Sequence, residues 1–151
     1  MNLTETPDTV QWPETHYVYL EKVGPFMQTA PAAWNEVLKF VPAIVAHSQI
    51  TGRFSLYKTG PKIYRAGVAL NAAPAGVPEG LQYEKFCGGK YRRFTFTGSY
   101  LQLGPASGRA WELASQLGLP LRDDFNIENY VNDPHTTPED QLITEILFPV
   151  H

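Results

Sequence analysis

The chain contains an internal duplication, and this feature limits its possible folds more than any other. Sliding the sequence by 74 positions places Tyr17 on Tyr91 and Gly24 on Gly98. In both segments an extended, aromatic-rich run ends at the glycine, and a stretch of helical character with one tryptophan follows. The same order of punctuated elements occurs twice, which indicates a fold built from two similar halves.

Each half is predicted to fold as strand, helix, strand, strand. The strands are inferred from β-branched and aromatic enrichment with period-two alternation. We expect one α+β domain over residues 1–151, with halves at about 10–71 and 81–150. The predicted architecture has pseudo-twofold symmetry, antiparallel sheets with the helices on one face, and a ligand groove between the halves. The Ala/Pro/Gly-rich connector is expected to begin as a surface loop and to end in a short strand segment.

Proline and glycine residues predict where the two helices begin and end. The first helix is expected to open near Thr29 and to be broken or kinked at Pro42, because proline removes an internal hydrogen bond. The second helix can hold Pro105 in its first turn, where the missing N–H is harmless. Gly118 should end this helix, since glycine readily adopts the left-handed conformation of a C-terminal cap.

Composition excludes several classes of protein. The 151 residues carry 12 Lys+Arg against 15 Asp+Glu, so no basic surface for nucleic acid is expected. The single cysteine, Cys87, cannot form an internal disulfide. The first residues are polar and acidic, and no apolar run approaches about 18 residues. We therefore expect a cytoplasmic protein without a signal peptide or a membrane segment.

Alternation along residues 125–132 suggests a candidate site. Apolar side chains such as Ile127 are expected to pack beneath the helices, which leaves Glu128 and Tyr130 on the opposite, helix-free face. At the equivalent positions of the first half, Ser55 and Tyr57 should have the same orientation. The alternative is an ordinary solvated glutamate beside tyrosines that only pack.

Several stretches resemble the GyrI-like effector-binding domain, which occurs alone and in multidrug-responsive regulators of the AraC and MerR types. The matching stretches are VYLEKVGPF (18–26), CGGKYRRFTFTGSY (87–100), IENYVNDP (127–134), LITEILFPV (142–150) and the helix around Trp111. This resemblance implies a duplicated βαββ fold that binds a small molecule. In family members that bind lipophilic cations, a pocket acid faces the cation between aromatic rings, and Glu128 occupies the matching position. The expected ligand-binding residues are Glu128, Tyr130, Tyr57, Ser55, Trp111, Phe96 and Tyr100.

The sequence departs from the family pattern in three places. No helix-turn-helix or winged-helix extension is present, so the chain is not expected to act alone as a transcription regulator. Ser99 follows the second-half glycine where the family often has proline. The stretch GPASG (104–108) is poor in helix formers for the start of its helix.

Three functional hypotheses follow, and the first is a stand-alone binding protein for amphipathic or aromatic, possibly cationic, small molecules. Because related members hydrolyse strained cyclopropane-bearing toxins, the second is a small-molecule hydrolase that uses Glu128 and Tyr130. The third is a protein-interaction module such as a gyrase modulator, whose protein partner is unknown.

No cofactor and no metal are expected. The four histidines form no HExxH motif or i, i+4 pair, so a zinc site is disfavoured. The wider fold resembles haem-binding SOUL-type proteins. Among the four histidines, His47 is the best candidate for an axial haem ligand. However, a histidine at that position is explained equally well by the helix C-terminus, which favours a positive charge.

Overall fold

The computed structural model describes residues 1–151, which form two compact units. The terminal unit comprises Met1–Trp12 and Lys90–His151, and the internal unit comprises Pro13–Gly89. The elements of the internal unit are β2 (Thr15–Val23), α1 (Phe26–Val45), β3 (Ile50–Lys58), β4 (Ile63–Leu70) and β5 (Gln82–Phe86). The elements of the terminal unit are β1 (Asp8–Trp12), β6 (Gly89–Thr97), α2 (Leu103–Gln116), β7 (Asn126–Tyr130), β8 (Ile143–Pro149) and the short 3-10 helices Tyr100–Gln102 and Glu139–Gln141. The fold is therefore α+β, as predicted.

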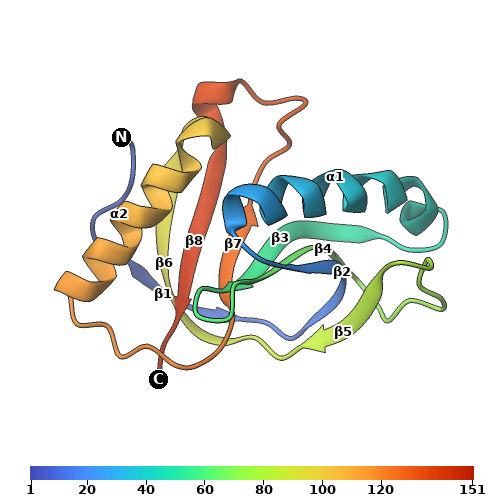
Figure 1. The fold of residues 1–151 in the computed structure, drawn as a ribbon, viewed down its shortest axis with the longest axis horizontal. Coiled ribbons are helices and arrows are strands. Elements are labelled where there is room, and N and C mark those ends of the chain that lie inside the picture. The colour runs from blue at the N-terminus through green and yellow to red at the C-terminus, as the bar shows by residue number, and fades with distance from the viewer. The chain divides into compact units, whose positions relative to one another are not determined.

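The predicted duplication is confirmed by the topology of the two units. The internal unit contains β2, α1, β3 and β4 in that order, and the terminal unit repeats it as β6, α2, β7 and β8. Within each unit the last strand of the repeat lies between the other two, in the orders β3-β4-β2 and β7-β8-β6. The strands pair antiparallel in both cases. Within each unit the helix lies across one face of the sheet (Figure 1).

The same backbone contacts occur at the strand-to-helix turn of both repeats. The N–H of Gly24 donates to the carbonyl of Lys62 at 3.0 Å, and that of Gly98 donates to the carbonyl of Leu142 at 2.8 Å. Both glycines have a positive φ, 136° and 151°, which a residue with a side chain rarely adopts. The glycines that revealed the duplication are thus required by the turn geometry.

One edge strand, β1, was not predicted from the sequence. It lies beside β6, and an ion pair of 2.5 Å between Arg93 and Asp8 attaches it there. Arg92 adds a hydrogen bond of 3.1 Å to the carbonyl of Pro7. Because β1 is short and mostly exposed, its sequence lacks the apolar alternation that identifies a half-buried strand.

The helix α1 is longer than predicted, since it begins before Thr29 and continues through Pro42 to Val45. Its last turn is held by Ile44, a buried residue that packs in a cluster with Val68. This burial stabilises the end of the helix, although Pro42 removes one backbone hydrogen bond. The predicted break at Pro42 is therefore wrong, while a kink there stays a prediction.

The helix α2 ends as predicted. Pro105 lies in its first turn, and Gly118 has a φ of 62° directly after the C-terminal cap. The N–H of Leu119 reaches back to the carbonyl of Ala114 at 3.1 Å, as in a Schellman motif.

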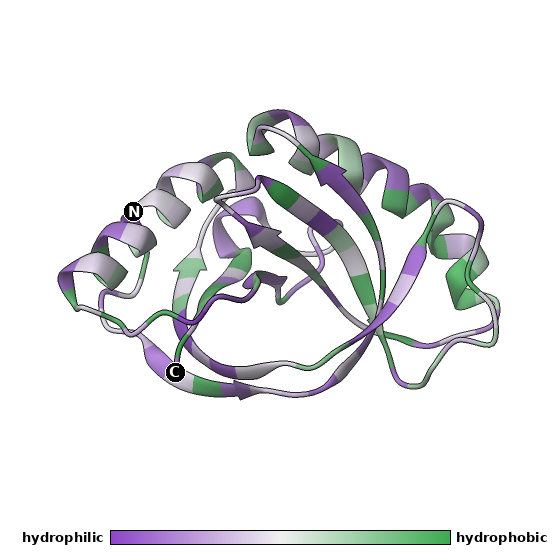
Figure 2. Cartoon of the chain, turned by 60° about the horizontal axis from the view of Figure 1, so that its bottom comes forward, coloured by the Kyte–Doolittle hydropathy of each residue, from purple (hydrophilic) through white to green (hydrophobic).

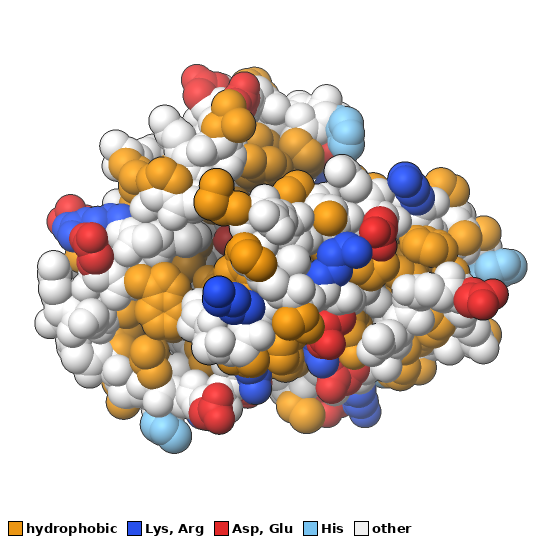
Figure 3. Space-filling model, in the orientation of Figure 1, with side chains coloured by type: hydrophobic (Ala, Val, Ile, Leu, Met, Phe, Trp, Pro, Cys, Tyr) orange, Lys and Arg blue, Asp and Glu red, His pale blue; other side chains and the backbone are white.

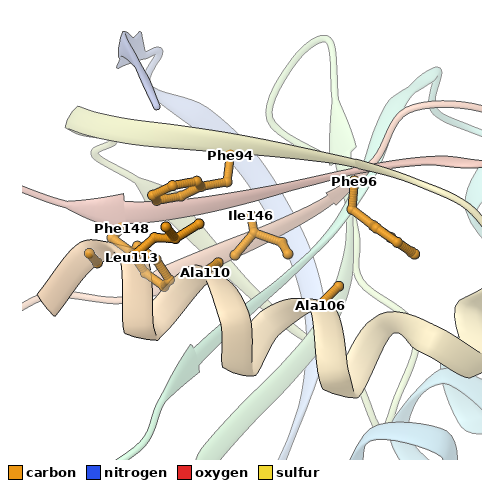
Figure 4. Close-up of a cluster of buried hydrophobic side chains, with 8 residues drawn as sticks. Phe94, Phe96, Ala106, Ala110, Leu113, Ile146 and Phe148 are labelled. Atoms are coloured by element: carbon orange, nitrogen blue, oxygen red, sulfur yellow. The ribbon is translucent and has the colours of Figure 1, made fainter. Parts of the chain in front are cut away.

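Hydrophobic cores lie between each helix and its sheet. In the terminal unit, Ala106 and Ala110 bring α2 close to large strand side chains, which point toward the helix in Figure 4. These strand residues are Phe94, Phe96, Ile146 and Phe148. In the internal unit, Ala33 and Val37 of α1 have the same role. Hydrophobic and hydrophilic residues alternate along the strands and helices (Figure 2).

Neither helix combines the length and apolar character needed to cross a lipid bilayer. On the face drawn in Figure 3, hydrophobic, acidic and basic side chains are interspersed.

Candidate functional site

Glu128 and Tyr130 lie on the face of the sheet that α2 covers, so the predicted helix-free face is wrong. Glu128 is paired with Ile146, and Tyr130 is paired with Thr144. Residues directly opposite in an antiparallel pair share a face, and Ile146 belongs to the core beneath α2. By contrast, Ile127 is paired with Leu147, so it points away from α2.

The error has a simple physical cause. Alternation shows which side chains share a face, but it does not show which face the helix covers. Burial was assumed to mark the helix side, yet Ile127 and Leu147 are both fully buried on the other side of this sheet. Both faces of the strand are therefore shielded from solvent, and hydrophobicity alone cannot separate them.

Ser55 and Tyr57 of the internal unit likewise face their helix, against the prediction. Ser55 is paired with Ala66, and Tyr57 is paired with Tyr64. The indole N–H of Trp34, on α1, donates to Ser55 Oγ at 3.1 Å. The correspondence between the two repeats is nevertheless as predicted. Ser55 and Tyr57 occupy the positions in β3 that Glu128 and Tyr130 occupy in β7.

A neutral hydrogen-bond network surrounds Ser55. Trp34 also donates to Tyr64 Oη at 2.9 Å, and Ser55 Oγ and Tyr64 Oη lie 2.6 Å apart. Ser55 and Tyr64 are buried. In the internal unit the polar groups at this position therefore bind one another.

The carboxylate of Glu128 lies in a desolvated but hydroxyl-lined position. Tyr130 Oη donates to Glu128 Oε1 at 2.5 Å, and Ser107 of α2 contributes a second side-chain hydrogen bond. Desolvation by burial raises the pKa of Glu128 above its ordinary value of 4.5, and the two hydrogen bonds lower it in part. The residue as a whole is intermediate in exposure, although its carboxyl group is closely surrounded by protein.

The ring of Tyr130, which bonds this carboxylate, belongs to an aromatic pair. Tyr100, at the start of the 3-10 helix before α2, meets Tyr130 edge to face, with ring centroids 5.6 Å apart. In the internal unit, Phe26 and Tyr57 form the equivalent edge-to-face pair, also at 5.6 Å. The terminal unit thus repeats the aromatic pair and adds a carboxylate to it.

Phe96 and Trp111, the other two predicted site residues, lie in or against the core beneath α2. Phe96 is fully buried in that core. Trp111 is half-buried, and its ring centroid lies 4.3 Å from that of Phe148. Phe96 therefore packs, whereas Trp111 can report on changes near α2 by fluorescence.

Sequence reasoning did not identify Ser107 or Thr144 as site residues. Ser107 lies in the stretch GPASG (104–108), which drew notice for its lack of helix formers, and its contact with Glu128 depends on how α2 is placed over β7. Thr144 is fully buried, and its Oγ1 has no hydrogen-bond partner. The sequence shows only a β-branched residue inside an apolar strand, which gives no sign that its hydroxyl lacks a hydrogen-bond partner.

No cluster of three or more His, Cys, Asp or Glu side chains is arranged to hold a metal ion. Cys87 is exposed and carries a free thiol.

Comparison with known proteins shows the family of the chain. The family model of the GyrI-like small molecule binding domain matches residues 5–151. The chain belongs to the GyrI-like family. A comparison with curated protein sequences found no match.

Solved structures show the same fold at low sequence identity. The EcmrR C-terminal domain is 18% identical, with a TM-score of 0.71 over 99% of this chain and 97% of that one. SAV2435 bound to tetraphenylphosphonium is 12% identical, with a TM-score of 0.72 over 96% of this chain and 93% of that one. A hydrolase from Listeria innocua is 11% identical, with a TM-score of 0.56 over 98% and 93%. These likenesses relate this GyrI-like chain to the C-terminal domain of EcmrR and to a ligand-bound protein of the same fold.

Proposed function

We propose that this GyrI-like protein binds amphipathic, aromatic cations beneath the first turns of α2, with Glu128 as the charge partner. The single observation that carries the proposal is the environment of that carboxylate. It is desolvated, it belongs to a residue of intermediate exposure, and it is bonded by Tyr130, whose ring meets that of Tyr100. A carboxylate and aromatic ring faces both favour a delocalised cation.

The site has no basic side chain of its own to neutralise Glu128. The pKa of Glu128 is shifted only by desolvation and by the hydroxyls of Tyr130 and Ser107. A desolvated carboxylate without a counterion is costly, and it either takes up a proton or binds a cation. A cationic ligand with an apolar body satisfies the charge and fills the apolar surroundings at once.

The family and one relative support the ligand class. The GyrI-like family is a family of small-molecule-binding domains, and SAV2435 has been solved with the lipophilic cation tetraphenylphosphonium. Tetraphenylphosphonium is therefore a suitable probe for cation binding by this chain.

Cation binding should weaken as the pH falls. The ligand needs the ionised carboxylate, and burial raises the pKa of Glu128 above 4.5. Affinity is therefore expected to be greatest above the raised pKa and to decline as the pH is lowered through it, before an ordinary glutamate would titrate. Titration of tetraphenylphosphonium by tryptophan fluorescence at several pH values measures this. Neutral triphenylphosphine oxide is the matched probe, and equal, pH-independent binding of both compounds would contradict the proposal.

A hydrolase is the second candidate, because Tyr130 and Glu128 form a hydrogen bond of 2.5 Å at a carboxyl group with a raised pKa. The ionised carboxylate can take a proton from a water molecule while the oxygen of that water attacks a strained cyclopropane carbon. The electron pair of the broken C–C bond then accepts a proton, so the net reaction is addition of one water molecule. Incubation with a cyclopropane-bearing alkylator should give a product heavier by one water in mass spectrometry. Intact substrate throughout the incubation would exclude this activity for that compound.

A further inference from the structure

Thr144 occupies the centre of a row of side chains that face α2. The pairing of β8 with β6 and β7 puts Phe96 on one side of Thr144 and Tyr130 on the other. In the next row, Glu128 lies opposite Ile146, two residues along β8. Thr144 and Glu128 are therefore diagonal cross-strand neighbours on one face, a spacing that a small ligand group can bridge.

The hydroxyl of Thr144 is fully buried and has no hydrogen-bond partner. A buried hydroxyl without a partner destabilises the folded protein, and valine would occupy the same strand position without this cost. The internal unit differs at the equivalent position, where the hydroxyl of Tyr64 is bonded to Trp34 and Ser55. Of these two equivalent hydroxyls, only that of Thr144, in the unit that carries Glu128, has no hydrogen-bond partner.

We propose that Thr144 makes the site selective for protonated amines, by accepting an N–H hydrogen bond from an ammonium group that also pairs with Glu128. This inference rests on the proposed function and names its ligand class. Primary and secondary ammonium ions carry at least two N–H donors, one for Glu128 and one for Thr144. Quaternary ammonium and phosphonium ions carry none, so they gain the charge interaction alone.

The structure also indicates the direction of approach. Phe96 is fixed in the core beneath α2, whereas Tyr130 keeps some exposed surface on the other side of Thr144. The ammonium group therefore reaches the hydroxyl from the Tyr130 side, where it displaces the edge of that ring. The apolar body of the ligand remains against the Tyr100–Tyr130 pair.

A matched pair of ligands tests this selectivity. The probes are protonated biphenylmethylamine, whose three N–H donors can serve both partners, and its N,N,N-trimethyl quaternary counterpart, titrated near neutral pH. The wild-type protein should bind the primary ammonium at least about tenfold more tightly than the quaternary ion, because the hydrogen bond to Thr144 adds to the one that Glu128 accepts. In Thr144→Val the ratio of the two affinities should fall by about tenfold, while Thr144→Ser, which keeps the hydroxyl, should retain it.

The outcomes separate this inference from the proposed function. Equal affinity of the two ions for the wild-type protein, or an unchanged ratio in Thr144→Val, overturns the role of Thr144. If both ions nevertheless bind and both lose affinity in Glu128→Gln, the proposed function stands. If neither ion binds, the proposed function fails and this inference fails with it. Thermal unfolding of Thr144→Val should show no loss of stability, because the substitution removes a buried hydroxyl without a partner.

Discussion

Replacing Glu128 by glutamine is expected to weaken the binding of lipophilic cations by about 2–5 kcal/mol, the usual cost of removing one charge from a desolvated pair. Glutamine has nearly the same shape and can still accept the hydrogen bond that Tyr130 donates. The loss therefore reports the charge and not the packing. Fluorescence titration of tetraphenylphosphonium against the wild-type protein and Glu128→Gln measures it.

Two controls accompany this measurement. Glu112→Gln, at an exposed position of α2, removes one negative charge outside the site and should leave cation affinity nearly unchanged. Glu128→Gln should also be at least as stable as the wild type at neutral pH. Because folding raises the pKa of Glu128, its ionised form opposes folding above that pKa. The difference in the free energy of unfolding between the two proteins should therefore disappear as the pH falls below 4.5. Equal cation binding by wild type and Glu128→Gln would remove the carboxylate from the site.

Gly67→Ala is expected to reduce the free energy of unfolding by about 3 kcal/mol or more, because it overpacks a rigid part of the core. A Cβ atom at Gly67 would lie 2.4 Å from Cζ of Tyr17 and 2.7 Å from its Oη. The Tyr17 ring is fully buried, and its hydroxyl donates to the carbonyls of Phe54 at 2.8 Å and Arg65 at 3.3 Å. The ring can move aside only by giving up these hydrogen bonds.

Gly60→Ala is the matched control, since an added Cβ there meets nothing within 4 Å and its backbone has no positive φ. Urea unfolding followed by tryptophan fluorescence should place the midpoint of Gly67→Ala well below that of Gly60→Ala, which should remain close to wild type. Equal midpoints for the two variants would show that β2 and β4 can separate to admit the methyl group.

Tyr17 and Tyr91 show how far the duplication could be inferred from sequence. They coincide when the chain is shifted by 74 positions, and both are fully buried tyrosines. The hydroxyl of Tyr17 donates to the carbonyl of Phe54 at 2.8 Å, and that of Tyr91 donates to the carbonyl of Phe125 at 2.9 Å. The two tyrosines thus have the same role, a buried hydroxyl that donates to a backbone carbonyl of the same unit. This role depends on how the strands of one repeat are arranged, so it recurs with the repeat.

The order of strands and helices within each repeat, the turns at the duplicated glycines, and the common face of Glu128 and Tyr130 could all be predicted from the sequence. These features depend on residues close together in sequence, where alternation and backbone conformation are set locally. The face that α2 covers, the hydroxyl that Ser107 directs at Glu128, and the buried position of Thr144 emerged only in the folded protein. They depend on the packing of a helix over strands that lie far from it in sequence, and side-chain periodicity carries no information about that packing.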